Sequence, residues 1–452
     1  MKRTAQHRLA VLHRSVGSGS VPARAASAGR VSTADAAASA TAIPPAATHQ
    51  DNEFIQTALK AGVYGFHLGQ PGPELIPLQR IKQAVNEVIT ESADPLLLQY
   101  RQPVDFSSVR ENLATMLAEQ HGIPVDADCL AITPGNSAAL GMIFSNVGMR
   151  RARAPGDNSP ATAVVENPTY FLAGQMFADV GVETIGVGMD RDGLKVDEIT
   201  AMCAAGSAPD FVYTVPNFHN PTGISMSAAR RTQLLALAEQ HDFLVVSDEP
   251  YNLLAFGDTP AGLPMIASQT GTIDRVICLG SFSKLLAPGL RLGWIHTSPR
   301  LIAKAWRNVG VLDSGGALNP LGSLIINRLL ENGFLMENIQ NLKTVFGRRI
   351  DAMCAALEEH LPGCSYQRPS GGYFMWVELP EDFPADAEQL LAKASDENAP
   401  TPVVFTLGNR CIATLEDGDR QFGRMFRMSF AFHTEEEIAN GLAALGRVAA
   451  GF

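Results

Sequence analysis

The stretch that decides the fold is VICLGSFSKLLAPGLR, residues 276–291. Its first five residues are uncharged and begin with two β-branched side chains, which is typical of a buried strand in a parallel sheet. Lys284 follows this strand closely, between the hydroxyl side chains of Ser281 and Ser283 on one side and the cation of Arg291 on the other. Ligands bind at the carboxyl ends of strands in open α/β sheets, where a lysine that loses its proton becomes an amine nucleophile. We therefore predict a chemical role for Lys284, with a solvated loop lysine as the alternative.

Four further apolar runs precede this stretch, and polar residues follow each of them. The runs are 129–132, 163–165, 211–215 and 243–246, and the residues that follow are Gly135-Asn136-Ser137, Asn167-Pro168-Thr169-Tyr170, Asn220-Pro221-Thr222-Gly223 and Asp248-Glu249-Pro250-Tyr251. Helical segments alternate with the runs, a pattern typical of βαβ units and a mainly parallel sheet. One helix is expected after Ser227, which is a favourable N-cap. The sequence thus predicts that five strand ends bring polar side chains to one edge.

The rest of the chain gives coarser predictions from periodicity and from glycine and proline. These are a loop over 62–77, a helix over 78–90, a helix from about 107, a hairpin around 373–379 and a charged link over 380–400. The buried face of the first helix is expected to include Leu78, Ile81, Val85 and Ile89. That of the second is expected to include Val109, Leu113, Met116 and Leu117.

Composition excludes several classes of protein. The chain has 452 residues, 46% of them hydrophobic, but no uninterrupted apolar stretch long enough to span a membrane. Its six cysteines form no C-x-x-C pair, so we predict reduced core thiols in a reducing compartment, with neither disulfides nor a metal site. Without the six basic residues and one acidic residue of positions 1–50, the net charge of −11 becomes −16. Such a charge argues against nucleic acid as a partner and favours a small-molecule substrate.

The first 48 residues differ from the rest in being basic and rich in alanine and serine. Arg3, Arg8 and Arg14 lie among apolar residues in a weakly amphipathic pattern, which is similar to a mitochondrial presequence. We expect a targeting segment and a location in the mitochondrial matrix. The alternative is a disordered tail on a cytoplasmic protein.

Four motifs occur in this order along the chain and resemble one family. They are N-P-T-G at 220–223, D-x-x-Y at 248–251, S-x-S-K-x-x-x-x-G-x-R at 281–291 and R-x-S-F at 427–430. Over roughly residues 60–440 the chain resembles the class I/II, fold-type I aminotransferases that use pyridoxal 5'-phosphate, and it is most similar to their kynurenine/2-aminoadipate branch. The resemblance implies an α/β fold with a tail over 1–48, an arm over 49–100, a large cofactor domain over 101–325 and a smaller domain over 326–452.

The resemblance implies a role for each motif residue that reacts or holds the ring. Lys284 matches the lysine that forms a Schiff base with the cofactor and then moves the substrate's α-proton. Asp248 matches the carboxylate that keeps the pyridine nitrogen protonated, with a helix cap as the ordinary alternative. Asn220 and Tyr251 match the residues that hydrogen-bond the phenolic oxygen, and Tyr170 matches the aromatic side chain that stacks on the ring.

The phosphate and substrate contacts follow from the same resemblance. Ser281, Ser283, Arg291 and the backbone amides near Asn136 and Ser137 would bind the phosphate, because a helix N-terminus and a guanidinium both favour an anion. Tyr100 matches a tyrosine that a neighbouring subunit contributes, which implies a homodimer.

Arg427 matches the arginine that binds the substrate's α-carboxylate, with Arg424 as a competitor if the alignment shifts. Gly69 and Gln70 would line the substrate entrance. Departures from the family pattern are Asn136 in place of a smaller residue, Arg101-Gln102-Pro103 after Tyr100, Phe218-His219 at a variable pair, and Leu407-Gly408 in place of Pro-Gly.

The resemblance implies ping-pong transfer of an amino group from an L-amino acid to a 2-oxo acid such as 2-oxoglutarate. The donor stays open among 2-aminoadipate, kynurenine, aromatic and aliphatic amino acids. A second hypothesis keeps the cofactor but changes the reaction, as in C–S lyases and decarboxylases of this fold. A third is a non-catalytic sensor domain of a transcription regulator, which the acidic chain disfavours.

Overall fold

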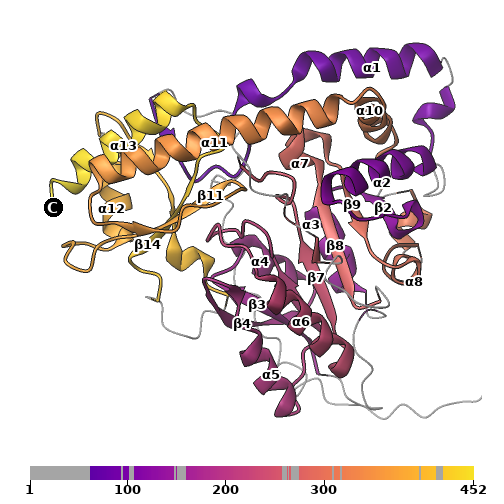
Figure 1. The fold of residues 1–452 in the computed structure, drawn as a ribbon, viewed down its shortest axis with the longest axis horizontal. Helices are drawn as coiled ribbons and strands as arrows, with labels where there is room; N and C mark the ends of the chain where they lie inside the picture. The colour runs from indigo at the N-terminus through magenta and orange to yellow at the C-terminus, as the bar shows by residue number, and fades with distance from the viewer. Residues whose placement is uncertain are drawn as a thin grey trace, which may run out of the picture. The chain divides into compact units, whose positions relative to one another are not determined.

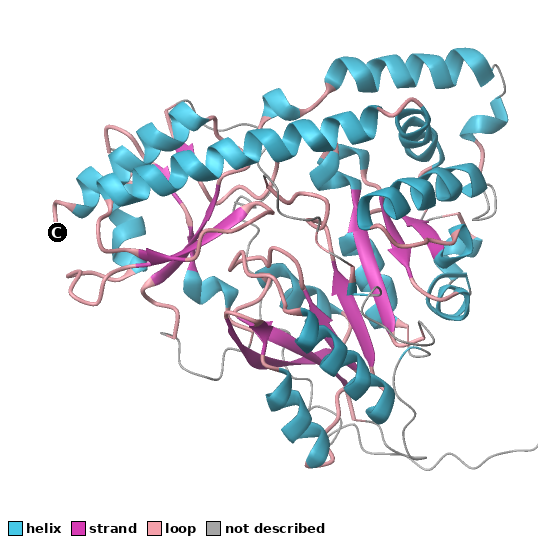
Figure 2. Ribbon diagram, in the orientation of Figure 1, coloured by secondary structure: helices cyan, strands magenta, loops and turns pink. Residues whose placement is uncertain are grey.

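The computed structural model describes residues 62–452 except 93–94, 101–105, 147–148, 150–158, 257–261, 263, 266–273, 308–309, 316–317, 397–398 and 414–420. The predicted tail over 1–48, residues 49–61 and 93–94 of the predicted arm and the Arg101-Gln102-Pro103 departure lie outside these residues. From Gly62 onward, the described residues belong to one compact unit. Figure 1 gives the positions of the elements, and Figure 2 distinguishes helices from strands.

An eight-stranded sheet forms the centre of this unit, in the order β2-β9-β8-β7-β6-β3-β4-β5. Its strands are β2 Leu130–Thr133, β3 Ala161–Asn167, β4 Val182–Asp190, β5 Gly193–Leu194, β6 Phe211–Thr214, β7 Leu244–Asp248, β8 Val276–Ser281 and β9 Gly293–His296. The neighbours among β4, β3, β6, β7 and β8 pair parallel, and β9 pairs antiparallel with both β8 and β2. All five predicted strands therefore run in one direction and end at one edge, as expected from the sequence.

Alternation along the strands places side chains on both faces of this sheet. Val164 and Val212 pack with α5 and α6 in one cluster, while their chain neighbours Val165 and Tyr213 pack in the larger cluster on the other face. The helices that connect and cover the strands are α3 Asn136–Ser145, α4 Phe171–Asp179, α5 Val196–Ala204, α6 Ala228–His241, α7 Phe282–Leu285, α8 Pro299–Ile302 and α9 Gly310–Asp313. Ser227 caps α6 as predicted, because its hydroxyl accepts from the Arg230 amide.

The helices at the start of the described chain have the predicted bounds but only partly the predicted faces. They are α1 Leu78–Ser92 and α2 Ser107–His121. The apolar residues of α2 are buried as expected. In α1, however, Leu78 is 65% exposed and Ile89 is 45% exposed, while Ala84 and Val88 are buried. The prediction for Leu78 and Ile89 was wrong. The buried face of α1 is centred on Ala84 and Val88, and Leu78 and Ile89 lie outside it.

A second sheet of four antiparallel strands lies in the C-terminal part, in the order β10-β11-β14-β13. Its strands are β10 Ser365–Tyr366, β11 Phe374–Glu378, β13 Thr406–Leu407 and β14 Met425–Ser429; the nearby pair is β1 Tyr64–Gly65 with β12 Val403–Val404. The helices here are α10 Pro320–Glu331, α11 Phe334–His360, α12 Ala387–Ala394 and α13 Glu435–Ala449. The predicted charged link over 380–400 was wrong in part, because a capping box formed by Asp386 and Gln389 starts α12 within it.

The long helix α11 connects the two sheet regions by packing against α13, α10 and α7 (Figure 1). The segment around β1 also contacts the C-terminal region, because β1 pairs with β12 and the Ser429 amide donates to the Phe66 carbonyl. The six cysteines are all free. No helix within the described ranges is both long and apolar enough to cross a membrane.

Candidate active site

One cavity opens at the sheet edge where the predicted strand ends meet. It contains about 1120 Å³ of space, open solvent at its mouth included. Of the predicted site residues, all but Tyr100 line it: Gly69, Gln70, Asn136, Ser137, Tyr170, Asn220, Asp248, Tyr251, Ser281, Ser283, Lys284, Arg291 and Arg427. His67, Phe171, Leu172 and Phe374 line it too and were not predicted. Chain segments hundreds of residues apart thus converge on one space.

Lys284 lies in the short helix α7, directly after β8. Its Nζ atom donates to the Gly69 carbonyl at 2.5 Å and lies 5.5 Å from the centre of the Tyr373 ring. The pKa of Lys284 is lowered to about 8, mainly by burial and also by the charges of Arg427 and Arg291, while Asp248 acts in the opposite direction. An amine with this pKa is available near neutral pH both as a nucleophile and as a proton acceptor.

Asp248 ends β7 and is buried in the wall of the same cavity. One carboxylate oxygen accepts from Asn136 Nδ2 at 2.6 Å, and the other accepts from the Tyr213 hydroxyl at 3.0 Å. Burial raises the pKa of Asp248 to about 6, while these two hydrogen bonds act in the opposite direction. The carboxylate therefore remains mostly ionised at neutral pH in spite of its burial.

Arg427 lies on β14 and is held by three acceptors. Nη1 donates to Asn220 Oδ1 at 2.9 Å, and Nη2 donates to the His67 carbonyl at 2.7 Å and to Thr406 Oγ1 at 3.1 Å. The guanidinium carbon lies 4.0 Å from the centre of the Phe374 ring. Burial lowers the pKa of Arg427, but a guanidinium keeps its charge in proteins.

The competing candidate, Arg424, lies elsewhere. It donates to the carbonyls of Pro380, Phe383 and Ala385, and it is not among the residues that line the cavity. The structure therefore places Arg427, and not Arg424, at the site. The odd spacing of three residues explains the difference, since side chains on an extended segment alternate between its two sides.

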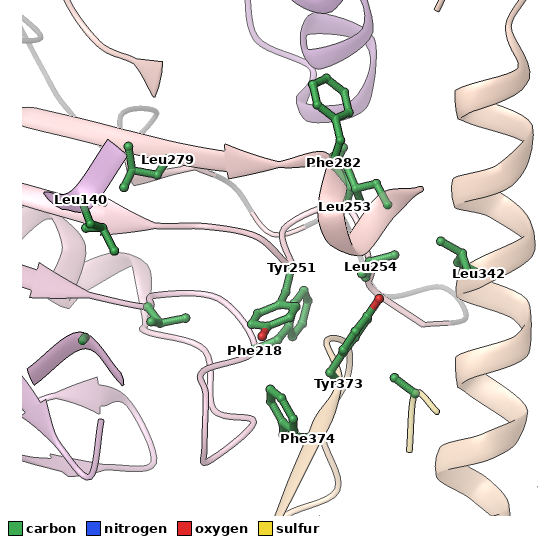
Figure 3. Packing of buried hydrophobic residues seen from close by; sticks show 14 of the residues in the cluster. Leu140, Phe218, Tyr251, Leu253, Leu254, Leu279, Phe282, Leu342, Tyr373 and Phe374 are labelled. Atoms are coloured by element: carbon green, nitrogen blue, oxygen red, sulfur yellow. The ribbon is translucent and has the colours of Figure 1, made fainter. Parts of the chain in front are cut away.

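Aromatic rings form the walls between these charged groups. Tyr251 lies 5.4 Å from Tyr373 and 6.0 Å from Phe374, measured between ring centres, and Figure 3 shows the three side chains close together. On the other wall the Tyr170 and Phe171 ring centres are 5.6 Å apart. Burial raises the pKa of Tyr170 to about 12 and raises that of Tyr251 as well. Both phenols thus stay protonated and can donate hydrogen bonds.

The other end of the cavity is suited to an anion. The helix α3 begins there after Gly135, whose φ of 93° lies in the region that favours glycine. A side chain at that position would start 3.0 Å from Arg291 Nη2, so glycine also leaves room for the guanidinium. Ser281 and Ser283 are buried beside it, and the Ser281 hydroxyl accepts from the Ser283 amide. Free helix amides and a guanidinium together form a phosphate-binding arrangement.

A buried pair of side chains, Glu166 and His219, contacts the N-P-T-G turn on the side away from the cavity. Glu166 on β3 accepts from the Val215 amide and lies 3.1 Å from Nε2 of His219, whose Nδ1 lies 2.9 Å from Thr222 Oγ1. The Thr222 amide also points at Nδ1, so this nitrogen is the acceptor and Nε2 carries the proton toward Glu166. Residues on both sides of Asn220 are therefore tied to β3. The only sequence signal for this role was an acidic residue at the end of an apolar run.

Tyr100 is 85% exposed and does not line the cavity of its own chain. Its predicted contact with the phosphate of a neighbouring subunit stays a prediction. Tyr213, by contrast, contacts Asp248 but was predicted only as part of a strand.

Comparison with known proteins extends these observations. Residues 56–445 match the family model for aminotransferase class I and II. Aromatic-amino-acid aminotransferase 1 of Thermococcus litoralis is 33% identical over 401 residues, which are 87% of this chain and 89% of that protein.

Two solved structures have similar folds. Kynurenine aminotransferase of Pyrococcus horikoshii, in complex with PMP, KYN as substrates and KYA as products, superposes with a TM-score of 0.75 at 30% identity, over 87% of this chain and 92% of that chain. Alpha-aminoadipate aminotransferase of Thermus thermophilus, complexed with N-(5'-phosphopyridoxyl)-L-leucine, gives a TM-score of 0.70 at 28% identity, over 86% of this chain and 93% of that chain. The similarity covers nearly all of the described residues.

Proposed function

This chain belongs to the class I and II aminotransferase family, whose members are pyridoxal-phosphate-dependent transaminases, and we propose that it takes the amino group from L-amino acids with aromatic side chains. The acceptor is a 2-oxo acid such as 2-oxoglutarate, and pyridoxal phosphate binds in the cavity at the sheet edge. The choice of donor rests on the residues that line the cavity. Aromatic rings line it, and each of its cations is assigned to the cofactor or to the substrate's α-carboxylate.

The residues present suit pyridoxal phosphate at each of its functional groups. Arg291 and the N-terminus of α3 would hold the phosphate, Asp248 would pair with the ring nitrogen, and Tyr170 would lie against the ring. Among the buried side-chain atoms described, Asn136 Oδ1 and Arg427 Nε in the cavity wall have no hydrogen-bond partner, so both are available to a bound ligand. When bound, the cofactor supplies a carbonyl group that accepts an amine and a ring that withdraws electrons from the substrate's α-carbon.

The chain's own groups provide the proton transfer and the orientation. Lys284 Nζ, neutral in a large fraction of molecules near pH 8, takes the proton from the substrate's α-carbon and returns it at the neighbouring position. Arg427 binds the α-carboxylate with its two-nitrogen fork, and Asn220 fixes the orientation of that fork. The aromatic rings beside these groups are apolar, which lowers the local dielectric constant and strengthens each electrostatic contact.

The donor proposal follows from the charges in the cavity. Among the described residues that line it, the cations are Lys284, Arg291 and Arg427, and they serve the amine, the phosphate and the α-carboxylate. No further cation is present among the described lining residues to bind an acidic side chain; Arg410 lies 5.9 Å from the centre of the Phe171 ring but is not part of the lining. An aromatic ring, in contrast, could pack on Phe171 and Phe374. The names of the Thermococcus and Pyrococcus relatives agree with this choice, since they are aromatic-amino-acid and kynurenine aminotransferases.

A donor screen tests the proposal. Protein loaded with pyridoxal phosphate is mixed with phenylalanine, tyrosine, kynurenine, 2-aminoadipate or glutamate, and the change in cofactor absorbance and the 2-oxo acid formed are measured. We expect kcat/KM to be about tenfold higher for aromatic than for acidic donors, with Phe171→Ala reducing that ratio. Equal or faster use of acidic donors would overturn the donor assignment. Release of ammonia and pyruvate without an acceptor would instead assign the chain to the lyases.

The dimer and the cellular location are further parts of the proposal. The exposure of Tyr100 supports a site completed by a second copy. Mixing Tyr100→Ala with Lys284→Ala protein would then restore activity, because one site of the mixed dimer holds both native residues. No restoration would contradict the shared site. Import of a reporter fused to residues 1–48 into mitochondria tests the matrix location, and a cytosolic reporter would exclude it.

A further inference from the structure

Asn136 contacts the cavity in two separate ways. It is the first residue of α3, so its backbone lies among the free amides beside Arg291. Its side chain, however, turns away from that end, and Nδ2 donates to Asp248 Oδ1 at 2.6 Å and to the Leu279 carbonyl at 3.3 Å. One residue thus contacts both the anion-binding end of the cavity and the Asp248 carboxylate.

We propose that Asn136 is a positioning residue that, together with Tyr213, holds the Asp248 carboxylate ionised and oriented toward the ring nitrogen of the cofactor. The inference rests on the proposed function, since it assigns the ring nitrogen to Asp248. It also gives a task to one of the positions at which this sequence departs from the family pattern, where a smaller side chain is common.

The geometry leaves Asp248 little freedom. Each of its oxygens accepts one hydrogen bond, from Asn136 on one side and from the Tyr213 hydroxyl at 3.0 Å on the other. Tyr213 is fully buried on β6, the neighbour of β7, and burial raises the pKa of its phenol, so the hydroxyl keeps its proton. Rotation of the carboxylate would break both bonds at once. Two donors from different elements therefore fix its plane.

The other groups near Asp248 do not replace these donors. Glu249 raises the pKa of Asp248, Lys284 lowers it, and the hydroxyls of Tyr170 and Tyr251 lie in the same electrostatic environment. Burial is the largest influence and favours the neutral acid. Loss of the Asn136 amide would therefore raise the pH at which Asp248 becomes protonated, and a neutral acid attracts a pyridinium proton less strongly.

The unfavourable burial of one polar atom of Asn136 supports a functional role for this residue. Its Oδ1 atom is buried without a hydrogen-bond partner among the described residues, which is unfavourable for folding. A residue present only to fill space would not need that amide. The amide nitrogen, by contrast, is fully used, since it contacts both Asp248 and Leu279.

The experiment measures cofactor binding instead of turnover. Dissociation constants of pyridoxal phosphate are determined by absorbance titration between about pH 5.5 and 8.5 for the native protein, Asn136→Ala, Asn136→Ser and Tyr213→Phe. At pH 7 we expect Asn136→Ala to weaken binding about tenfold, because a hydrogen bond to a charged group is lost while the backbone amide at the phosphate end remains. The pH at which binding weakens at the acidic end should also move upward.

A cofactor analogue separates positioning from a structural role. When CH replaces the ring nitrogen, Asp248 has no pyridinium to pair with, so Asn136→Ala should bind this analogue as the native protein does. The control is Asn146→Ala at the far end of α3, where the amide donates to the Lys304 carbonyl, and it should leave both constants unchanged.

Three outcomes decide the matter. Unchanged pyridoxal phosphate binding in Asn136→Ala across the pH range, in a native protein that binds the cofactor, would overturn this inference alone. Equal weakening for cofactor and analogue would show a structural role and would also overturn it. If the native protein did not bind pyridoxal phosphate, the proposed function would fail as well. Tyr213→Phe, which removes one hydroxyl, gives the same test should Asn136→Ala not fold.

Discussion

Lys284 and Arg427 are two buried cations in the wall of one cavity, and they differ in what burial does to them. Burial lowers the pKa of both. Lys284 reaches a pKa of about 8 and donates to the Gly69 carbonyl. Arg427 has three acceptors and lies on the Phe374 ring. The same environment thus makes the lysine a reversible proton carrier and leaves the arginine a permanent charge, because their intrinsic basicities differ.

Replacing Lys284 should have the largest effect. Lys284→Ala removes the amine and is expected to lower kcat by about 10⁴-fold, the upper end for a lost acid–base group. Lys284→Arg is the matched control, because it retains a cation that cannot act as a base, and it should be equally inactive. Steady-state kinetics and the absorbance change on adding a donor measure both. Substantial turnover in either variant would show that the proton carrier lies elsewhere.

Arg427→Lys tests whether the planar guanidinium, and not only a positive charge, is needed at this position. The charge remains, but the two-nitrogen fork and the contact with Phe374 are lost, so kcat/KM should fall roughly 100-fold, mainly through KM for donor and acceptor alike. Binding of pyridoxal phosphate should be nearly unchanged, since Arg427 is not at the phosphate end. Arg424→Lys is the control and should stay near native activity. A fall in kcat without a change in KM would contradict the clamp.

Loss of the His219 contacts that hold the turn of Asn220 should reduce activity less than the two changes above. His219→Ala breaks the contacts of this ring with Glu166 and Thr222, which allows the turn that carries Asn220 to move. We expect KM to rise about tenfold, as for loss of one well-made buried hydrogen bond, and His219→Gln, which can still donate to Glu166, to recover part of it. The measurement is KM for each substrate beside a thermal unfolding curve. Unaltered KM in a correctly folded His219→Ala would remove this role.

The smallest effect concerns stability of the cofactor-free protein. The pKa of Lys284 is about 8 in the folded chain against an ordinary 10.5, so between these pH values the unfolded state holds a proton that the folded state lacks. Stability contributed by this position therefore rises with pH across that window and is constant outside it. Lys284→Met removes the dependence. Urea unfolding at about pH 7.5, 8.5 and 9.5 measures the free energy of unfolding of Lys284→Met and of the native protein. The excess stability of Lys284→Met should decrease as the pH rises, and a constant excess would contradict the lowered pKa.

Much of the site could be predicted because polar residues followed short apolar runs. Asp248 closely follows the run 243–246 and Lys284 the run 276–280, and strand direction alone brings both to one edge. The missed strands β4 and β9 show the limit of that argument. β4 is nine residues long and only partly buried. β9 begins with a glycine and follows β8 after α7 and one 3-10 turn, so neither has the sequence pattern of a buried parallel strand.

The sequence alone determined the chemical types at the site: an amine, a carboxylate, phenols and guanidinium groups, in an order along the chain that matches one family. Tertiary structure decided which of these groups act together. It placed Arg427 in the cavity wall and Arg424 outside it, turned the Asn136 side chain to Asp248, and brought Phe171 and Phe374 to the cavity. The reason is physical, because a pKa or a hydrogen bond depends on burial and on distances of a few ångströms between segments that the sequence separates by hundreds of residues.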